Sequence, residues 1–159
     1  MCSSDLSYAL HAPDRVDRLA LLDPSMCFSG MSPTYRLHAV PLFLPGRRAE
    51  RMRRFLRWET GGAPLDPAWL ELTGLATEAR TAPIVLPRRP AADRLRRLRV
   101  PTLVLVAEKT RSHDPARVAA NARALLPDVR VATLRGATHH TIPTLDPGAL
   151  NAELGRFLS

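Results

Sequence analysis

The sequence predicts an α/β protein with a mainly parallel sheet and helices on both of its faces. Two observations point to this class. Short apolar runs typical of buried strands alternate with amphipathic segments along the chain. The clearest run, PTLVLVA at 101–107, is apolar and β-branched. Strands separated by helices in this way are expected to be joined by right-handed crossovers.

The first elements are the end of a helix and a strand. Residues 7–12 have helical character and stop at Pro13. Residues 16–22 form a short apolar run that ends at Asp23-Pro24, which suits a buried parallel strand. The domain division predicted from this pattern makes 7–24 one unit.

The stretch 25–94 differs in character, because Pro and Gly interrupt it repeatedly. Within it, 47–60 has apolar residues at helical spacing and arginines around the rest of the wheel. Asp66-Pro67 is a typical start for a second helix running toward residue 79. The Pro-rich segment 81–90 is predicted to return the chain to the sheet, so 25–94 is expected to be a helical insert.

The C-terminal unit, 95–159, continues the alternation. After the strand at 101–107, Asp114-Pro115 begins a helix predicted over 116–126. Residues 129–134 alternate like a strand, 136–142 form a loop, and 147–158 form a closing helix with one apolar face.

Composition restricts the function classes. The net charge of +8 comes almost entirely from arginine, in a chain without stacking aromatics or RNA-binding motifs, so a nucleic-acid partner is not favoured. The longest apolar run, 100–107, is far shorter than the roughly 18 residues that a membrane span needs. With only two cysteines, a cytoplasmic location is expected. No cofactor or metal is predicted, and no oligomeric state.

Three segments together resemble the second half of the α/β-hydrolase superfamily: YALHAPDRVDRLALLDP at 8–24, LRRLRVPTLVLVAEK at 95–109 and VRVATLRGATHH at 129–140. Their order and spacing are those of the family's last strands. The resemblance implies a partial α/β-hydrolase fold in which 25–94 is the helical cap over the substrate pocket.

The same resemblance implies the site residues. His139 matches the Gly-Ala-x-His turn that bears the general base, a role that suits an imidazole. The triad acid usually follows the 101–107 strand, where this chain has Thr110. Asp114 is the preferred substitute, with Glu108 nearby. Asp23 stays open as the alternative, because some members carry the acid after the preceding strand.

The nucleophile of the family is a serine in Gly-x-Ser-x-Gly. Counting back from Pro13 places it before Met1, and neither the N-terminal serines nor Ser32 has this context. Residues 1–6 are expected to be a non-native scar.

The predicted function is therefore the C-terminal fragment of an α/β-fold serine hydrolase of the carboxylic ester type, inactive alone. Its intact parent would act on a small-molecule ester-like substrate. The alternative is a non-catalytic Arg-rich binding module acting through the helix at 47–57.

Overall fold

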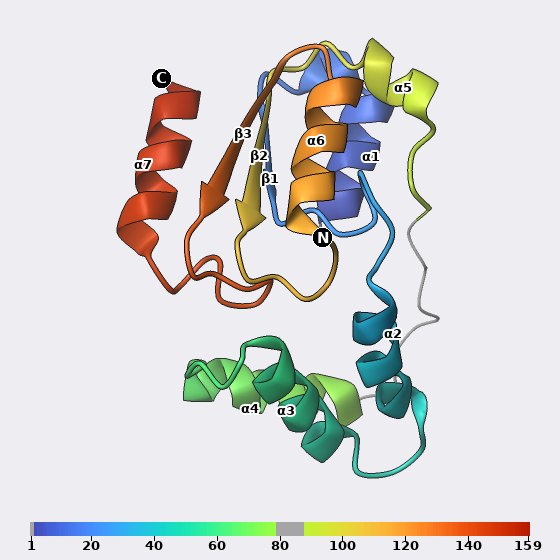
Figure 1. The fold of residues 1–159 in the computed structure, drawn as a ribbon, viewed down its shortest axis with the longest axis vertical. Helices are drawn as coiled ribbons and strands as arrows, with labels where there is room; N and C mark the ends of the chain where they lie inside the picture. Colours follow the sequence, from blue (N-terminus) through green and yellow to red (C-terminus); the bar gives the residue numbers. More distant parts are fainter. Residues whose placement is uncertain (1, 79–87) are drawn as a thin grey trace.

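The computed structural model describes residues 2–78 and 88–159. At its centre lies a parallel sheet with the strand order β1-β2-β3, formed by β1 (Leu19–Leu22), β2 (Thr102–Ala107) and β3 (Val129–Leu134). Thr102 of the middle strand pairs with Leu19 on one side and with Val129 on the other. All three strands therefore end at the same edge of the sheet (Figure 1), and the predicted α/β class with a parallel sheet is confirmed.

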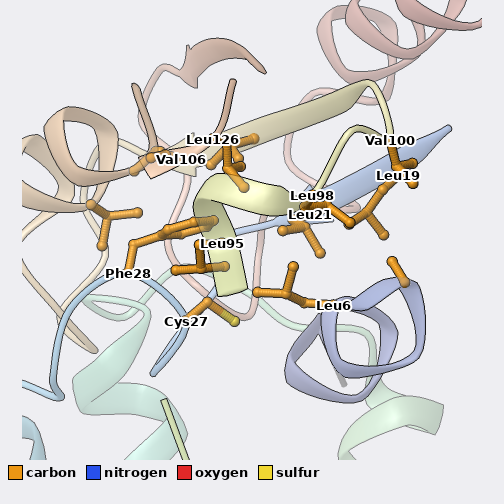
Figure 2. Packing of buried hydrophobic residues seen from close by; sticks show 14 residues of the cluster. Leu6, Leu19, Leu21, Cys27, Phe28, Leu95, Leu98, Val100, Val106 and Leu126 are labelled. Carbon is orange, nitrogen blue, oxygen red and sulfur yellow. The ribbon is translucent and has the colours of Figure 1, made fainter. Parts of the chain in front are cut away.

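The sheet has a hydrophobic core on each face because side chains alternate along β2. Val104 and Val106 point into one core, where they meet α1 (Cys2–His11), α5 (Ala92–Arg97) and α6 (Pro115–Leu125). Leu103 and Leu105 point into the other, beneath α7 (Pro147–Leu158). All six residues of β2 are buried, which explains why this strand is the most continuous apolar run in the sequence. Figure 2 shows the first of these cores.

Helix α1 includes most of the segment that was expected to be a scar. It begins at Cys2 and ends at His11, just before the short 3-10 helix η1 (Pro13–Arg15). Leu6 is completely buried and belongs to the same core as Leu21 of β1. Residues 2–6 are thus continuous with the fold, and their non-native origin stays a prediction.

Four elements lie beyond the carboxyl ends of the strands (Figure 1). They are α2 (Pro33–Ala39), η2 (Val40–Phe43), α3 (Arg48–Glu59) and α4 (Pro67–Glu78). Helix α3 packs through Phe55 and Trp58 onto Tyr35 of α2, with ring centroids 5.2 and 6.1 Å apart. Gly61 and Gly62 end α3 with positive φ angles of 64° and 84°, which other residues adopt only with strain.

The predicted helices at 47–60 and 66–79 correspond to α3 and α4, and those at 116–126 and 147–158 to α6 and α7. Most of the Pro-rich segment 81–90 lies outside the described residues. In the described part of the chain, no helix has both the length and the apolar character needed to cross a membrane.

Candidate active site

The site is built around Asp23, the residue that follows β1. Its carboxylate is completely buried, and its backbone has a φ of 45°, a left-handed conformation that is strained outside glycine. The backbone N–H of Asp23 donates to Leu105 O at 2.7 Å, which keeps the turn attached to β2. Two groups from the β2 end donate to the side chain: Ala107 N to Oδ1 at 3.0 Å and Thr110 Oγ1 to Oδ2 at 2.7 Å. The carboxylate is thereby fixed at the carboxyl edge of the sheet.

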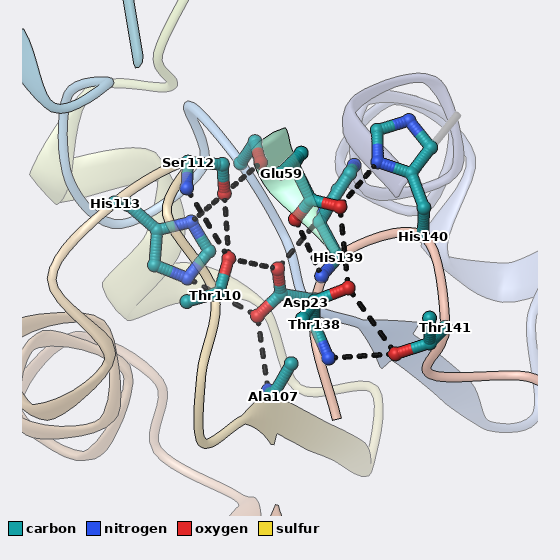
Figure 3. Close-up of polar contacts among 11 residues, drawn as sticks. Asp23, Glu59, Ala107, Thr110, Ser112, His113, Thr138, His139, His140 and Thr141 are labelled. Carbon is teal, nitrogen blue, oxygen red and sulfur yellow. Dashed lines mark hydrogen bonds and ion pairs between the residues drawn. The ribbon is translucent and has the colours of Figure 1, made fainter. Parts of the chain in front are cut away.

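His139 lies on the loop between β3 and α7 and reaches the same carboxylate. Its Nδ1 is 2.8 Å from Asp23 Oδ2, while 30% of its side chain remains exposed (Figure 3). The loop is tied to the end of β2, because Lys109 N donates to Ala137 O and Gly136 N donates to Glu108 Oε2, both at 2.8 Å. When the neutral imidazole donates its Nδ1–H to Asp23, Nε2 carries a lone pair and can accept a proton.

A second histidine faces Asp23 from the opposite side. His113 is buried, and its Nε2 lies 3.3 Å from Asp23 Oδ1 without the geometry of a hydrogen bond. Its Nδ1 is 2.9 Å from Ser112 Oγ, which is in turn 3.0 Å from Thr110 Oγ1. Burial by itself raises the pKa of Asp23, but the neighbouring imidazoles of His113 and His139 outweigh it and hold this pKa well below its ordinary value. Asp23 is therefore ionised at neutral pH.

A second buried carboxylate, Glu59, contacts the histidine loop from α3. It is completely buried and accepts from Thr138 Oγ1 at 3.2 Å, from the backbone N–H of His139 at 3.0 Å and from His140 Nδ1 at 2.9 Å (Figure 3). Desolvation raises the pKa of Glu59, yet the hydrogen bonds and charge of His140, with Thr138 and the His139 amide, lower it overall.

Both histidines of the loop line a cavity of about 550 Å³. This volume is in the range of small-molecule sites. The cavity lies where the strand ends meet α4, and its lining is mainly apolar with a few polar groups: Leu22, Asp23, Ser25, Met26, Met31, Leu65, Asp66, Trp69, His139, His140, Ile142, Pro143 and Thr144. An imidazole held by a carboxylate at the wall of such a cavity can exchange protons with a bound molecule.

The structure distinguishes between the two carboxylates, Asp114 and Asp23, that the sequence left open as partners of His139. Asp114 is exposed and forms the N-cap of α6, where its Oδ1 accepts from Arg117 N at 3.1 Å. The partner of the imidazole is instead Asp23. Glu108, the other acid near this strand, accepts from Gly136 N. The preferred residue Asp114 is thus not the partner of His139, because its exposed carboxylate caps α6 instead.

The serine in the Gly-Met-Ser segment is also engaged elsewhere. Ser32 is the N-cap of α2: its Oγ accepts from Tyr35 N at 3.0 Å and donates to Arg111 O at 2.7 Å. Ser25, which lines the cavity, has its Oγ 3.1 Å from Ser112 Oγ.

Among the described residues, no three His, Cys, Asp or Glu side chains are grouped so that they could hold a metal ion.

Neither Glu59 nor His113 is marked as a site residue by a pattern in the sequence. Glu59 ends an Arg-rich helix, where an acidic residue ordinarily faces solvent, so its burial had no signal in the pattern. The substitution of Thr110 for the usual acid was a signal for Asp23, since an acid missing after one strand has to come from elsewhere. In the structure, the hydroxyl group of Thr110 donates a hydrogen bond to the carboxylate of Asp23.

Comparison with solved structures identifies the fold. The chain has part of the α/β-hydrolase fold. It is similar to a putative hydrolase from Bacillus subtilis, with a TM-score of 0.86 and 22% identity over 99% of this chain and 57% of that one. The naproxen esterase, carboxylesterase NP, of Bacillus subtilis gives a TM-score of 0.83 and 23% identity over 99% and 56%. A meta-cleavage product hydrolase from Pseudomonas fluorescens gives 0.77 and 16% over 99% and 61%.

The chain therefore spans a little more than half the length of these structures. No family model matches it. No curated protein matches it.

Proposed function

We propose that this chain is the acid–base half of a serine hydrolase that acts on carboxylic ester bonds of small molecules. One observation carries the proposal: at the carboxyl ends of parallel strands, His139 Nδ1 lies 2.8 Å from the buried carboxylate of Asp23, in the wall of a cavity of about 550 Å³. Esterases among the similar structures support the ester class.

In the proposed reaction, His139 Nε2 removes the proton of a serine hydroxyl as the serine oxygen attacks the ester carbonyl. The imidazolium then returns this proton to the alcohol oxygen as the acyl–oxygen bond breaks. Water repeats the two steps on the acyl enzyme and releases the acid. Asp23 keeps the ring in the Nδ1–H tautomer and stabilises the imidazolium, a role that fits its burial and its fixed position.

The nucleophile in this proposal comes from a part of the fold outside the present chain. Ser32 caps α2 and Ser25 contacts Ser112, so neither is paired with the imidazole. The similar structures are nearly twice as long as the region that they share with this chain, which leaves room for such a segment. We infer that the chain alone does not turn over esters.

The helices α2, α3 and α4 would cap the substrate pocket. Leu65, Asp66 and Trp69, at or just before the start of α4, line the same cavity as His139. The mainly apolar lining suits an apolar acyl or alcohol group. The cytoplasmic location predicted from the cysteine content is part of the same proposal.

The test is an assay of the purified chain beside its His139→Ala variant. Hydrolysis of p-nitrophenyl acetate and butyrate is measured, and a fluorophosphonate probe reports any activated serine. We expect no labelling and equal background rates for the two proteins. Labelling or turnover that disappears in His139→Ala would show a nucleophile within the chain and would overturn the fragment proposal.

A further inference from the structure

Glu59 is the feature that the proposed reaction does not use. It is the last residue of α3, about 80 residues before the histidine loop, and yet its carboxylate is completely buried against that loop. Its three contacts fall on three consecutive residues, Thr138, His139 and His140. One of these contacts goes to a main-chain N–H, so Glu59 acts on the backbone at the residue whose side chain meets Asp23.

Burying a carboxylate is costly unless charged or hydrogen-bonding partners replace its water. Glu59 has such partners at both oxygens: His139 N donates to Oε1, while Thr138 Oγ1 and His140 Nδ1 contact Oε2. Thr138 N in turn donates to Thr141 Oγ1 at 2.9 Å, which closes the loop on itself. The arrangement therefore restrains the loop at several points rather than forming one isolated ion pair.

His139 is consequently held at two points by carboxylates from different parts of the fold. Asp23, at the end of β1, holds the ring at Nδ1. Glu59, from α3, holds the main-chain nitrogen. The contact at the ring does not fix the backbone that carries it, so the second contact restrains the main chain at His139 and with it the positions that the ring can take.

His140 repeats the carboxylate–imidazole arrangement beside the first pair. Its ring lies 5.2 Å from that of His139, nearly perpendicular to it, and 6.0 Å from Trp69 in the cavity wall. With Nδ1 held by Glu59, the neutral ring is fixed as the Nδ1–H tautomer, and Nε2 is an acceptor.

We propose that Glu59 is a positioning residue that fixes the main chain of His139 and the tautomer of His140, and so couples the placement of α3 to the orientation of the proton-transferring imidazole. Its catalytic meaning rests on the proposed hydrolase function, whereas the contacts themselves can be tested without any activity.

The first test is the tautomer of His140 in Glu59→Gln, measured by long-range ¹H–¹⁵N NMR of the imidazole rings. A glutamine whose oxygen accepts from His139 N presents its NH₂ group to His140 Nδ1. We expect His140 to change from the Nδ1–H to the Nε2–H tautomer, a response that loss of packing alone does not produce. An unchanged His140 in a folded Glu59→Gln protein would overturn the proposal.

The second test is hydrogen exchange in Glu59→Ala. We expect the His139 amide to exchange roughly tenfold faster, as for loss of one buried hydrogen bond. Exchange at the end of α3 should increase with it, while β2 keeps its protection. Glu50→Gln is the matched control, because Glu50 lies on the same helix but is exposed. Faster exchange at α3 without any change at His139 would contradict the coupling.

The variant Asp23→Asn distinguishes a failure of this proposal from a failure of the proposed function. It should alter the His139 ring and leave the His140 tautomer unchanged, because His140 depends on Glu59. If Asp23→Asn leaves the His139 ring unchanged while Glu59→Gln switches His140, the hydrolase assignment fails and the Glu59 contacts stand. If Glu59→Ala does not fold, the tautomer measured in Glu59→Gln decides the question.

Discussion

Asp23 connects three segments that are distant in the sequence. Its carboxylate accepts from Ala107 N and Thr110 Oγ1 after β2 and contacts His139 after β3. His113 adds a second imidazole on the other side. Hydrogen bonds to an ionised carboxylate are stronger than those to a neutral acid, so the protonation of this single buried residue affects the whole site.

Acid should therefore destabilise the protein through its two buried carboxylates. The pKa values of Asp23 and Glu59 are lowered in the fold from ordinary values of 3.8 and 4.5. The stabilisation is fully present above these ordinary values and is lost as the pH falls, because the unfolded chain then binds more protons. Below pH 4.5 for Glu59 and below pH 3.8 for Asp23, we expect the free energy of unfolding in urea to fall by up to about 1 kcal/mol per pH unit for each group. A flat profile down to pH 3 would contradict the lowered pKa values, and Asp23→Asn and Glu59→Gln should each flatten it.

Asp114 should behave as a helix cap and not as part of the site. Its carboxylate accepts from Arg117 N at the start of α6 and is exposed. Asp114→Ala is expected to cost about 1 kcal/mol of stability, measured by urea unfolding. Asp114→Asn, which can still cap, is the matched control and should cost much less. A loss of several kcal/mol in Asp114→Ala would point to a role beyond capping.

Among the elements, α1 connects the N-terminal residues to the sheet. Leu6 and Ala9 are completely buried in the core beside β1, although residues 1–6 had been expected to be a non-native scar. The burial gives this helix a structural role that can be measured whatever the origin of its sequence.

Leu6→Ala should reduce stability by about 2–5 kcal/mol, because it removes a fully buried leucine from the core. Leu158→Ala at the end of α7 is the matched control: that side chain is 59% exposed, so its truncation should cost far less. Urea unfolding followed by circular dichroism measures both. Equal, small effects would show that α1 does not pack as described.

Local sequence patterns predicted the strands and most helices because they report burial and capping directly. The alternation at 129–134 corresponds to β3, and Asp114-Pro115 begins α6 as predicted. The short helix α2 was not predicted, although Ser32 and Pro33 form a local start signal for it. The burial of Glu59 had no local pattern, since it depends on the histidine loop, far away in the chain. The choice between Asp114 and Asp23 likewise required the β1–β2 register, which a sequence pattern does not contain.

At the scale of the whole molecule, the sheet has two edges in the described residues, at β1 and β3. Parallel strands are ordinarily paired or covered, and a free edge can pair with another chain. We expect the isolated chain to self-associate as its concentration rises. Light scattering after size-exclusion chromatography measures this self-association, and a monomer at every concentration tested would contradict the expectation.

The alternative function is an Arg-rich binding module. Salt-dependent binding of nucleic acid would favour this alternative.

The most direct test of the Asp23–His139 pair is the imidazole ¹⁵N NMR spectrum of the chain compared with those of Asp23→Asn and Asp114→Asn. We expect His139 to be the Nδ1–H tautomer in the wild-type chain and in Asp114→Asn. In Asp23→Asn, where the carboxylate that fixes this tautomer is gone, His139 should no longer be held as Nδ1–H. If Asp114→Asn altered His139 while Asp23→Asn left it unchanged, the proposed acid–base pair would be wrong.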